Sequence, residues 1–288
     1  RFAQGLGAVQ SAPPPRLVIT FVSDPPLIDI QSAVVWRGTT KVFDGLTLCI
    51  GQHEPTAILG PNGSGKTTLL KLITRELYPA TGNDATVRVL GRENWNVWEL
   101  RAHIGVVSHD LQARYRATTT GFDVVLSGFL SSVGVHGSLA GRITTSRRRR
   151  AAEAMAELGV GDLQDTPLRH MSTGQQRRCL LARALVHDPD TLILDEPTAG
   201  LDLEASFDYL RRIRALAAEG RNIVLVTHML NEIPPEIGRV IMLRGGRIVV
   251  DGPKDTAMTS GNLRKAFDTD LQLTTAGGFY FAYPPATT

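Results

Sequence analysis

The sequence predicts an α/β fold in which parallel strands are joined by crossover helices. From residue 27 onward, short runs rich in β-branched residues alternate with helical stretches, which is the pattern of such folds. A glycine-rich loop at residues 60–67 joins one predicted strand to one predicted helix. Between residues 110 and 170 the strand signals are weak and helical signals dominate. An α-rich insertion is therefore expected within the α/β core.

Individual elements follow from local patterns. One helix is predicted to begin at Gly65 and end near Leu77, before Pro79, and a second to run over residues 147–158 and stop at Gly159. Residues 45–50, preceded by Arg37 and Gly38, indicate an antiparallel hairpin. Six segments are predicted strands: 56–59, 86–90, 104–107, 191–194, 222–227 and 240–243.

The chain is expected to divide into three parts. Residues 1–26 contain two proline clusters and predict a flexible N-terminal arm, within which residues 17–22 have a strand-like pattern. Residues 27–253 form the main domain. Residues 254–288 are expected to be a C-terminal extension with no clear period, and the aromatic run 279–283 is interpreted as a packed tail.

Composition excludes several classes of protein. The 288 residues are 42% hydrophobic and 20% charged, which excludes fibrous and disordered chains. A net charge of +3 permits a nucleic-acid partner but does not require one. Residues 124–141 lack charged side chains but are interrupted by glycines and serines, so no membrane span is expected. Cys49 and Cys179 have no metal-ligand spacing, and both are expected to be buried, reduced thiols of a cytosolic protein.

The segment Gly60-Pro-Asn-Gly-Ser-Gly-Lys-Thr67 matches a phosphate-binding loop between a strand and a helix. Its glycines let backbone amides turn toward phosphate oxygens, and the helix N-terminus adds unpaired N–H groups. Lys66 is expected to bridge the β- and γ-phosphates, and Thr67 to ligate Mg²⁺. This motif alone predicts nucleoside triphosphate binding.

A second group of candidate residues follows the predicted strand 191–194. Asp195 and Glu196 come at its carboxyl end, where functional groups gather in open α/β sheets. Asp195 can hold Mg²⁺, directly or through water, and Glu196 can orient or deprotonate an attacking water.

Together with these two groups, four further features resemble the ABC ATPases. Residues 171–178, Met-Ser-Thr-Gly-Gln-Gln-Arg-Arg, resemble the signature motif of that family, and residues 197–202 resemble its D-loop. Thr227-His228 resembles the switch histidine, and Trp36 resembles the aromatic residue that stacks on adenine. The order and spacing match from about residue 27 to residue 252.

This resemblance implies a P-loop NTPase fold with a RecA-like core, an antiparallel β region and a helical subdomain at about residues 110–185. It also implies hydrolysis of ATP with Mg²⁺ as cofactor, with Glu196, His228 and Lys66 as catalytic residues and Thr67 and Asp195 at the metal. The implied ATP-binding residues are Trp36, Gly60, Pro61, Asn62, Gly63, Ser64, Gly65, Lys66, Thr67, Thr68, Ser172, Gly174, Gln175 and Asp202. Of these, Ser172 and Gly174 are implied to contact the γ-phosphate bound to a partner subunit.

The sequence departs from the family at two places. His109 stands where the family has its Q-loop glutamine, which contacts Mg²⁺ and the membrane partner, and Gln112 follows three residues later. Either His109 replaces that glutamine as a metal contact, or Gln112 reaches in, or the contact is missing. Thr173 also replaces a signature glycine, and its side chain is expected to point away from phosphate.

The resemblance favours an ATPase subunit that forms a homodimer around two ATP and drives a membrane permease on separate chains. Its Ser-Thr-Gly-Gln signature is similar to that of single-domain bacterial members, some named as metal or oxyanion importers. Such a subunit is expected in the cytoplasm, peripheral to the inner face of the cell membrane. One alternative is a stand-alone regulatory ABC ATPase, favoured by the altered Q-loop. The other is a nucleic-acid-associated ATPase, favoured only by the basic pI and the arginine run.

That arginine run, residues 147–150, begins a predicted helix. A solvated helix face is the simpler interpretation, and contact with nucleic acid or acidic lipid is the functional one. Arg177 and Arg178 follow the signature and are expected to orient it rather than to bind substrate.

Overall fold

The computed structural model describes residues 24–81, 84–135 and 137–285, and a six-stranded sheet lies at its centre. The strands stand in the order β5-β6-β7-β3-β8-β9 and are parallel, except that β9 runs antiparallel to β8. Their bounds are β3 Thr56–Leu59, β5 Ile104–Val107, β6 Thr191–Asp195, β7 Asn222–Thr227, β8 Arg239–Arg244 and β9 Arg247–Pro253. Five of the six predicted strand segments are thereby confirmed in this sheet.

The parallel strands are buried on both faces. In β6, Leu192 and Leu194 join one hydrophobic core, whereas Ile193 joins the other. Strands β3, β7 and β8 divide their apolar side chains between the same two cores. Such continuous apolar runs are what a sheet covered on both faces requires.

An antiparallel sheet covers one of these faces. It consists of β1 (Ile28–Arg37), β2 (Thr40–Ile50) and β4 (Thr86–Val89) in the order β2-β1-β4, which confirms the predicted hairpin. The predicted strand at residues 86–90 is confirmed as β4, but its expected place in the parallel sheet was wrong, because β4 pairs antiparallel with β1. Its alternation of buried and half-buried residues fits a strand with only one face on a core.

The helices lie mostly between and beside the strands. Their bounds are α1 Lys66–Ile73, α2 Val97–His103, α3 His109–Ala113, α4 Gly121–Leu126, α5 Thr145–Glu157, α6 Thr173–Leu185, α7 Leu203–Ala218, α8 Lys254–Ala257 and α9 Ser260–Phe267. Helix α1 ends earlier than the predicted Leu77. Arg75 lies just past it with a φ of 60°, and its guanidinium donates to the carbonyl of Val87 in β4.

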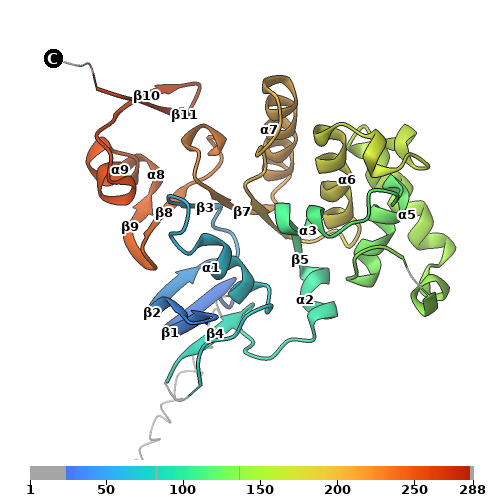
Figure 1. The fold of residues 1–288 in the computed structure, drawn as a ribbon, viewed down its shortest axis with the longest axis horizontal. Coiled ribbons are helices and arrows are strands. Elements are labelled where there is room, and N and C mark those ends of the chain that lie inside the picture. Colours follow the sequence, from blue (N-terminus) through green and yellow to red (C-terminus); the bar gives the residue numbers. More distant parts are fainter. Residues whose placement is uncertain (1–23, 82–83, 136, 286–288) are drawn as a thin grey trace, which may run out of the picture.

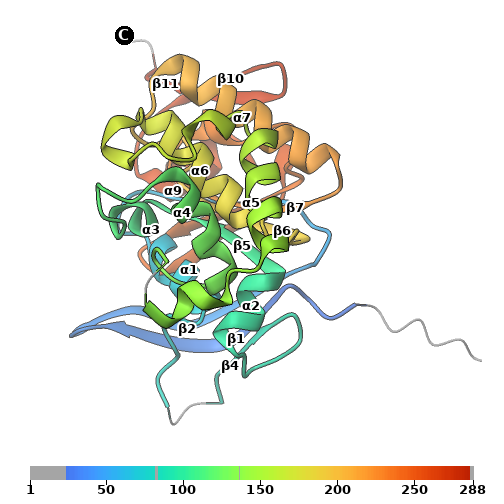
Figure 2. The same ribbon diagram turned by 90° about the vertical axis from the view of Figure 1, so that its right-hand side faces the viewer.

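A helical block lies at one side of the central sheet, as predicted for residues 110–185 (Figure 1). Helices α4, α5 and α6 pack on one another, and α6 also packs against β5. The remaining turns of this block are the short 3₁₀ segments 127–130, 137–142, 161–163 and 168–170. Figure 2 shows the block from its own side, facing the viewer and above the β1-β2 hairpin.

The C-terminal residues form defined elements on the opposite side of the sheet (Figure 1). Ala257 of α8, Leu263 and Ala266 of α9, and Met258 between the two helices join a main core. Strands β10 (Gln272–Ala276) and β11 (Phe279–Tyr283) form a hairpin. Within the aromatic run, Phe279 and Tyr280 pack against that core, whereas Phe281 and Tyr283 are exposed. The expected packed tail is therefore confirmed for only part of the run.

Two other expectations can be compared with the fold. Cys179 is buried in α6 as expected, but the prediction that Cys49 is buried was wrong, because its side chain lies on the exposed face of β2. Both thiols are free. Within the described parts of the chain, no helix has the length and apolar character needed to cross a membrane. The strand-like pattern at residues 17–22 and most of the expected arm lie outside the described residues.

The turn between β8 and β9 generates a stability prediction. Gly245 and Gly246 both have positive φ, but a Cβ at Gly246 would lie 1.8 Å from the carbonyl oxygen of Val42, whereas a Cβ at Gly245 meets open space. We expect Gly246→Ala to lower the free energy of unfolding by about 3 kcal/mol and Gly245→Ala by about 1 kcal/mol. Thermal unfolding of both variants measures the difference. Equal losses would contradict the close approach of this turn to β2.

Candidate functional site

The glycine-rich loop passes from the end of β3 into α1 under tight steric limits. The amide of Gly60 donates to the carbonyl of Thr227, and a Cβ on Gly60 would lie 2.3 Å from the carbonyl oxygen of Leu243. Gly63 and Gly65 have φ values of 79° and 110°, which favour glycine. The amide of Gly246 donates to the carbonyl of Ser64, so the β8–β9 turn holds the loop from outside.

Lys66 is folded back into this loop. Its Nζ donates to the carbonyls of Gly60 (2.7 Å) and Pro61 (3.0 Å), and the residue is only 6% exposed. Burial lowers the pKa of the ammonium, and the carboxylates of Glu196 and Asp195 oppose that shift. A buried cation held among backbone groups at a helix N-terminus is suited to a polyanion such as a chain of phosphates.

Two carboxylates and a histidine lie at the neighbouring strand ends. Asp195 ends β6, and burial, reinforced by the charge of Glu196, raises its pKa to about 6. Glu196 has a φ of 47°, and its amide donates to the carbonyl of Val226. Its Oε1 lies 2.9 Å from Nδ1 of His228, the first residue past β7. The structure thus brings together the predicted Lys66, Asp195, Glu196 and His228.

The signature residues line a separate hollow. Ser172 caps α6, and its side chain forms a capping box with Gln175. Asp202 caps α7 by accepting from the amide of Ala205 at 2.8 Å. Ser172, Gly174 and Asp202 all line this hollow, so two helix N-termini meet there. Unpaired N–H groups at such termini attract anions, but this hollow is not the one lined by Thr67 and Asp195.

Trp36 lies at the end of β1, pairs with Lys41 across the hairpin and is 46% exposed. The Lys41 Nζ lies 5.5 Å from the centre of the indole ring. An exposed aromatic ring can stack on a planar ligand. Its predicted contact with adenine stays a prediction.

The segment after β5 contains His109 and Gln112, the two candidates for the Q-loop position. Nε2 of Gln112 donates to Oε1 of Gln176 in α6 at 2.8 Å, so the Gln112 amide is bound to the signature helix. His109 opens α3 with an exposed side chain, and its metal contact stays a prediction. Sequence analysis missed Asp110, which pairs with Lys71 at 2.9 Å and whose charge raises the pKa of Asp195. Its place three residues past the parallel strand β5 could have identified it.

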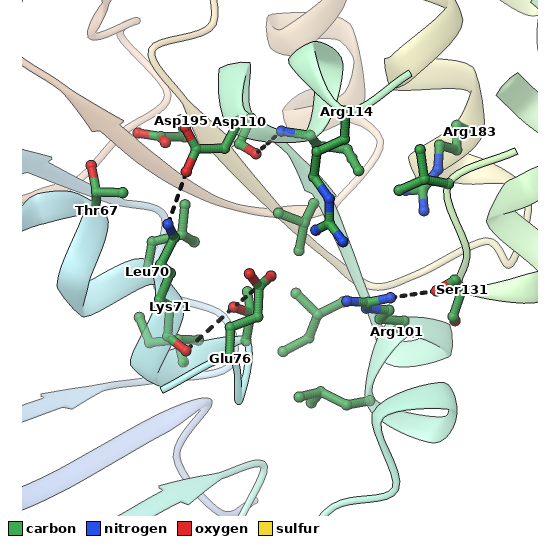
Figure 3. A pocket seen from close by; sticks show the side chains of 18 of the residues that line it. Thr67, Leu70, Lys71, Glu76, Arg101, Asp110, Arg114, Ser131, Arg183 and Asp195 are labelled. Atoms are coloured by element: carbon green, nitrogen blue, oxygen red, sulfur yellow. Dashed lines mark hydrogen bonds and ion pairs between the residues drawn. The ribbon is translucent and has the colours of Figure 1, made fainter. Parts of the chain in front are cut away.

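Asp110 belongs to a cavity of about 120 Å³ between α1, α2 and the helical block (Figure 3). Thr67 and Asp195 line one side, and Arg101, Arg114 and Arg183 line the other. Within the described residues, none of the three arginines forms an ion pair with a carboxylate. The three guanidinium groups thus lie on one side of the cavity, and the carboxylates of Glu76, Asp110 and Asp195 also line it.

The arginine run at residues 147–150 differs from the cavity arginines because some of its side chains pair with carboxylates within the chain. Arg150 pairs with Glu157 at 2.7 Å, Arg149 lies 3.6 Å from Glu153, and Arg147 lies over the ring of Phe129. Because these contacts occupy much of the run, the geometry favours the solvated helix face over a surface kept free for nucleic acid.

Sequence comparisons identify the relatives of this chain. A sequence profile described as "ABC transporter" matches residues 43–199. The cobalt import ATP-binding protein CbiO of Rhodobacter capsulatus is 34% identical over 83% of this chain and 85% of its own length. The hemin import ATP-binding protein HmuV of Bradyrhizobium diazoefficiens is 30% identical over 86% of this chain and 90% of its own length.

Solved structures share the fold. The structure of cbiO1 from Clostridium perfringens, part of an ABC transporter complex, superposes with a TM-score of 0.66 at 24% identity. It covers 84% of this chain and 94% of that one. An inward-facing conformation of a putative metal-chelate type ABC transporter superposes with a TM-score of 0.69 at 20% identity, over 90% and 96% of the two chains.

The raised pKa of Asp195 generates a pH prediction for the protein without nucleotide or divalent cations. The pKa is about 6 in the folded state and near 3.8 when exposed, so ionised Asp195 destabilises the fold at pH 7. We expect Asp195→Asn to raise the free energy of unfolding at pH 7 by up to about 3 kcal/mol. As pH falls from 7 to 4 the folded carboxyl takes up a proton first, so this advantage disappears.

Urea unfolding at several pH values measures that advantage. Asp162→Asn, which removes an exposed carboxylate, controls for the change in net charge. An Asp195→Asn advantage that stays constant across the pH range would contradict the predicted burial effect.

Proposed function

This chain belongs to the ABC transporter family of ATP-binding proteins, and from that premise we propose that it hydrolyses ATP as a homodimer and drives a separate membrane permease. The observation that carries the proposal is the convergence of Lys66, Asp195, Glu196 and His228 at one edge of the sheet. A cation for the phosphates and a carboxylate–histidine pair for the water are what hydrolysis of a phosphoanhydride requires.

ATP binding would use the loop as it stands. Backbone amides of the loop, other than those of Gly60 and Ser64, which donate to the carbonyls of Thr227 and Pro61, would surround the phosphates together with the N-terminus of α1. Lys66 would exchange its bonds to the Gly60 and Pro61 carbonyls for phosphate oxygens. Trp36 would stack on the base. Because the loop already holds the ammonium in place, little rearrangement is needed when the nucleotide binds.

The site also fits Mg²⁺. Thr67 and Asp195 line the same cavity beside the loop and offer the hydroxyl and carboxylate oxygens that this ion prefers. A bound Mg²⁺ would neutralise phosphate charge in the transition state. It would also favour the ionised form of Asp195, whose burial alone favours the protonated form.

Glu196 would accept the proton of the attacking water. Its backbone is fixed by the hydrogen bond to Val226, and its carboxylate is held by Nδ1 of His228. Those two contacts leave the carboxylate little freedom to turn away from the γ-phosphate. His228 would orient this base and touch the γ-phosphate with the rest of its ring.

The separate hollow at Ser172 supports the proposed homodimer. In a twofold pair, Ser172, Gly174, Gln175 and Asp202 of one copy would face the γ-phosphate held by the loop of the other. Each copy would then complete the site of its partner, and two ATP molecules would lie between them.

The permease is proposed to dock at the arginine-lined cavity beside α3. Arg101, Arg114 and Arg183 line the same cavity as Thr67 and Asp195, and among the described residues none of the three forms an ion pair with a carboxylate. A docked segment could therefore sense the nucleotide state. The named relatives import cobalt and hemin, so a metal or metal-chelate substrate is proposed for the assembled transporter. Its position would be cytoplasmic, at the inner face of the membrane.

The stand-alone alternative has one observation in its favour. His109 replaces the glutamine that couples family members to their permease, and Gln112 is bound to Gln176 instead. A chain without a permease would still bind and hydrolyse ATP through the same residues.

Glu196→Gln tests the shared hydrolytic site. We expect the variant to lose ATP hydrolysis by at least about 100-fold, because the base is gone, and to dimerise when saturated with Mg-ATP. Phosphate release and analytical ultracentrifugation measure the two effects. Lys66→Ala serves as the control and should lose both ATP binding and dimerisation. Normal hydrolysis by Glu196→Gln, or a monomer at saturating Mg-ATP, would contradict the proposal.

Membrane capture tests the permease. The tagged chain, purified from detergent-solubilised membranes of its own source, should retain a protein with several membrane spans. Arg114→Glu should release that protein by reversing a charge at the proposed docking cavity, whereas Arg148→Glu, on the exposed arginine run, should not. Catalysis without any spanning partner would favour the stand-alone alternative.

A further inference from the structure

The short segment between Glu196 and α7, residues 197–202, is anchored by a buried carboxylate. Glu232 is 2% exposed, and its Oε1 accepts from the amide of Thr198 at 3.1 Å and from the Thr198 hydroxyl. Its Oε2 accepts from the hydroxyl of Thr227, the last residue of β7. Glu232 therefore joins the segment to the strand end that carries His228.

A buried guanidinium anchors the same segment from the other side. Arg177 lies in α6 and is 0% exposed, and its Nη2 donates to the carbonyl of Ala199 at 3.4 Å. Its Nε and Nη1 have no hydrogen-bond partner among the described residues. Burial lowers the pKa of this guanidinium, and the nearby carboxylates of Asp195, Glu232 and Glu196 oppose that shift.

Both anchors belong to elements that carry site residues. Arg177 follows Ser172 on α6 by little more than one helical turn, so it is rigidly connected to the signature. Glu232 follows His228 in the next short turn. The anchored residues, Thr198 and Ala199, are neighbours in the chain. The helix that follows the signature and the segment that follows His228 therefore bind adjacent residues of segment 197–202.

Stability alone gives no reason for two buried charges here. Burying an ionised group costs free energy unless hydrogen bonds compensate it, and apolar side chains of similar volume often serve a fold equally well. Hydrogen bonds to buried charges are, however, stronger than those between neutral groups, so a residue that they hold should move together with its partner.

We propose that Arg177 and Glu232 are positioning residues that fix segment 197–202 to the signature helix and to the His228 loop, so that closure of one ATP site is transmitted to the other. This inference rests on the proposed homodimer. In that dimer each copy presents Ser172 to its partner's nucleotide and Glu196 to its own. The segment joins these two halves within one chain. Loss of an anchor should therefore weaken dimer closure and leave nucleotide binding to the separate monomer intact.

The experiment uses Arg177→Met in the hydrolysis-deficient Glu196→Gln chain. We expect about tenfold more Mg-ATP to be needed for half-maximal dimerisation, while the affinity of the dilute monomer for a fluorescent ATP analogue changes by less than about twofold. Arg177→Lys keeps the charge and should recover part of the loss. Glu232→Gln, which keeps the shape of the side chain, should shift dimerisation in the same direction as Arg177→Met.

Arg221→Met is the matched control. Arg221 is also largely buried, donates to the carbonyl of Pro189 at 2.7 Å and has an unpartnered Nε, but it lies away from residues 197–202. It should lower the melting temperature without changing the ATP dependence of dimerisation.

The outcomes separate the inference from the proposed function. Dimerisation of Arg177→Met at the ATP concentration of its parent, or an equal shift in Arg221→Met, would overturn the inference alone. If Arg177→Met does not fold, unchanged dimerisation of Glu232→Gln would overturn it. A Glu196→Gln parent that stays monomeric would overturn both the inference and the homodimer.

Discussion

The candidate ATP site depends on the hydrogen-bonded register of three adjacent strands. Leu59 of β3 pairs with Thr227 of β7, and Asp195 of β6 pairs with Val226 of β7. The phosphate loop, the acidic pair and the histidine therefore leave the sheet at one level. Because both faces of these strands are buried, a slip by one residue would place the side chains of each core in the other, where they would not fit, at a cost of about 1–3 kcal/mol for each overpacked residue.

A second constraint prepares the loop itself. The β8–β9 turn lies against β2 and binds the Ser64 carbonyl, while Gly60 has no room for a side chain beside Leu243. The loop is thereby fixed without a ligand, and its own carbonyls hold the buried ammonium of Lys66. Phosphate oxygens would replace these neutral acceptors by charged ones, which form stronger hydrogen bonds with an ammonium group. Nucleotide binding then does not have to offset the conformational entropy that ordering the loop would cost, so the affinity is higher.

The sequence predicts features that are local and cannot predict those that need distant partners. The parallel strands and the phosphate loop have short patterns with a direct structural cause. Strand β4 was misassigned because its four residues do not show which sheet they join, and Cys49 because a thiol on an amphipathic strand follows the strand's alternation. Asp110, Arg177 and Glu232 acquire their roles only through neighbours remote in sequence.

The separation of the two groups of site residues constrains any mechanism for this chain. Ser172 is fixed at the start of α6, inside the helical block, and lines a different hollow from Thr67 and Asp195. A signature that is held rigidly away from its own loop can contribute to hydrolysis only through another copy, or by movement of the whole block. The buried contacts of Arg177 and Glu232 oppose local movement, because pulling the segment away would leave charged groups unpaired in a medium of low dielectric constant. In the proposed homodimer, these contacts would therefore favour closure between copies over local movement of residues 197–202 within one copy.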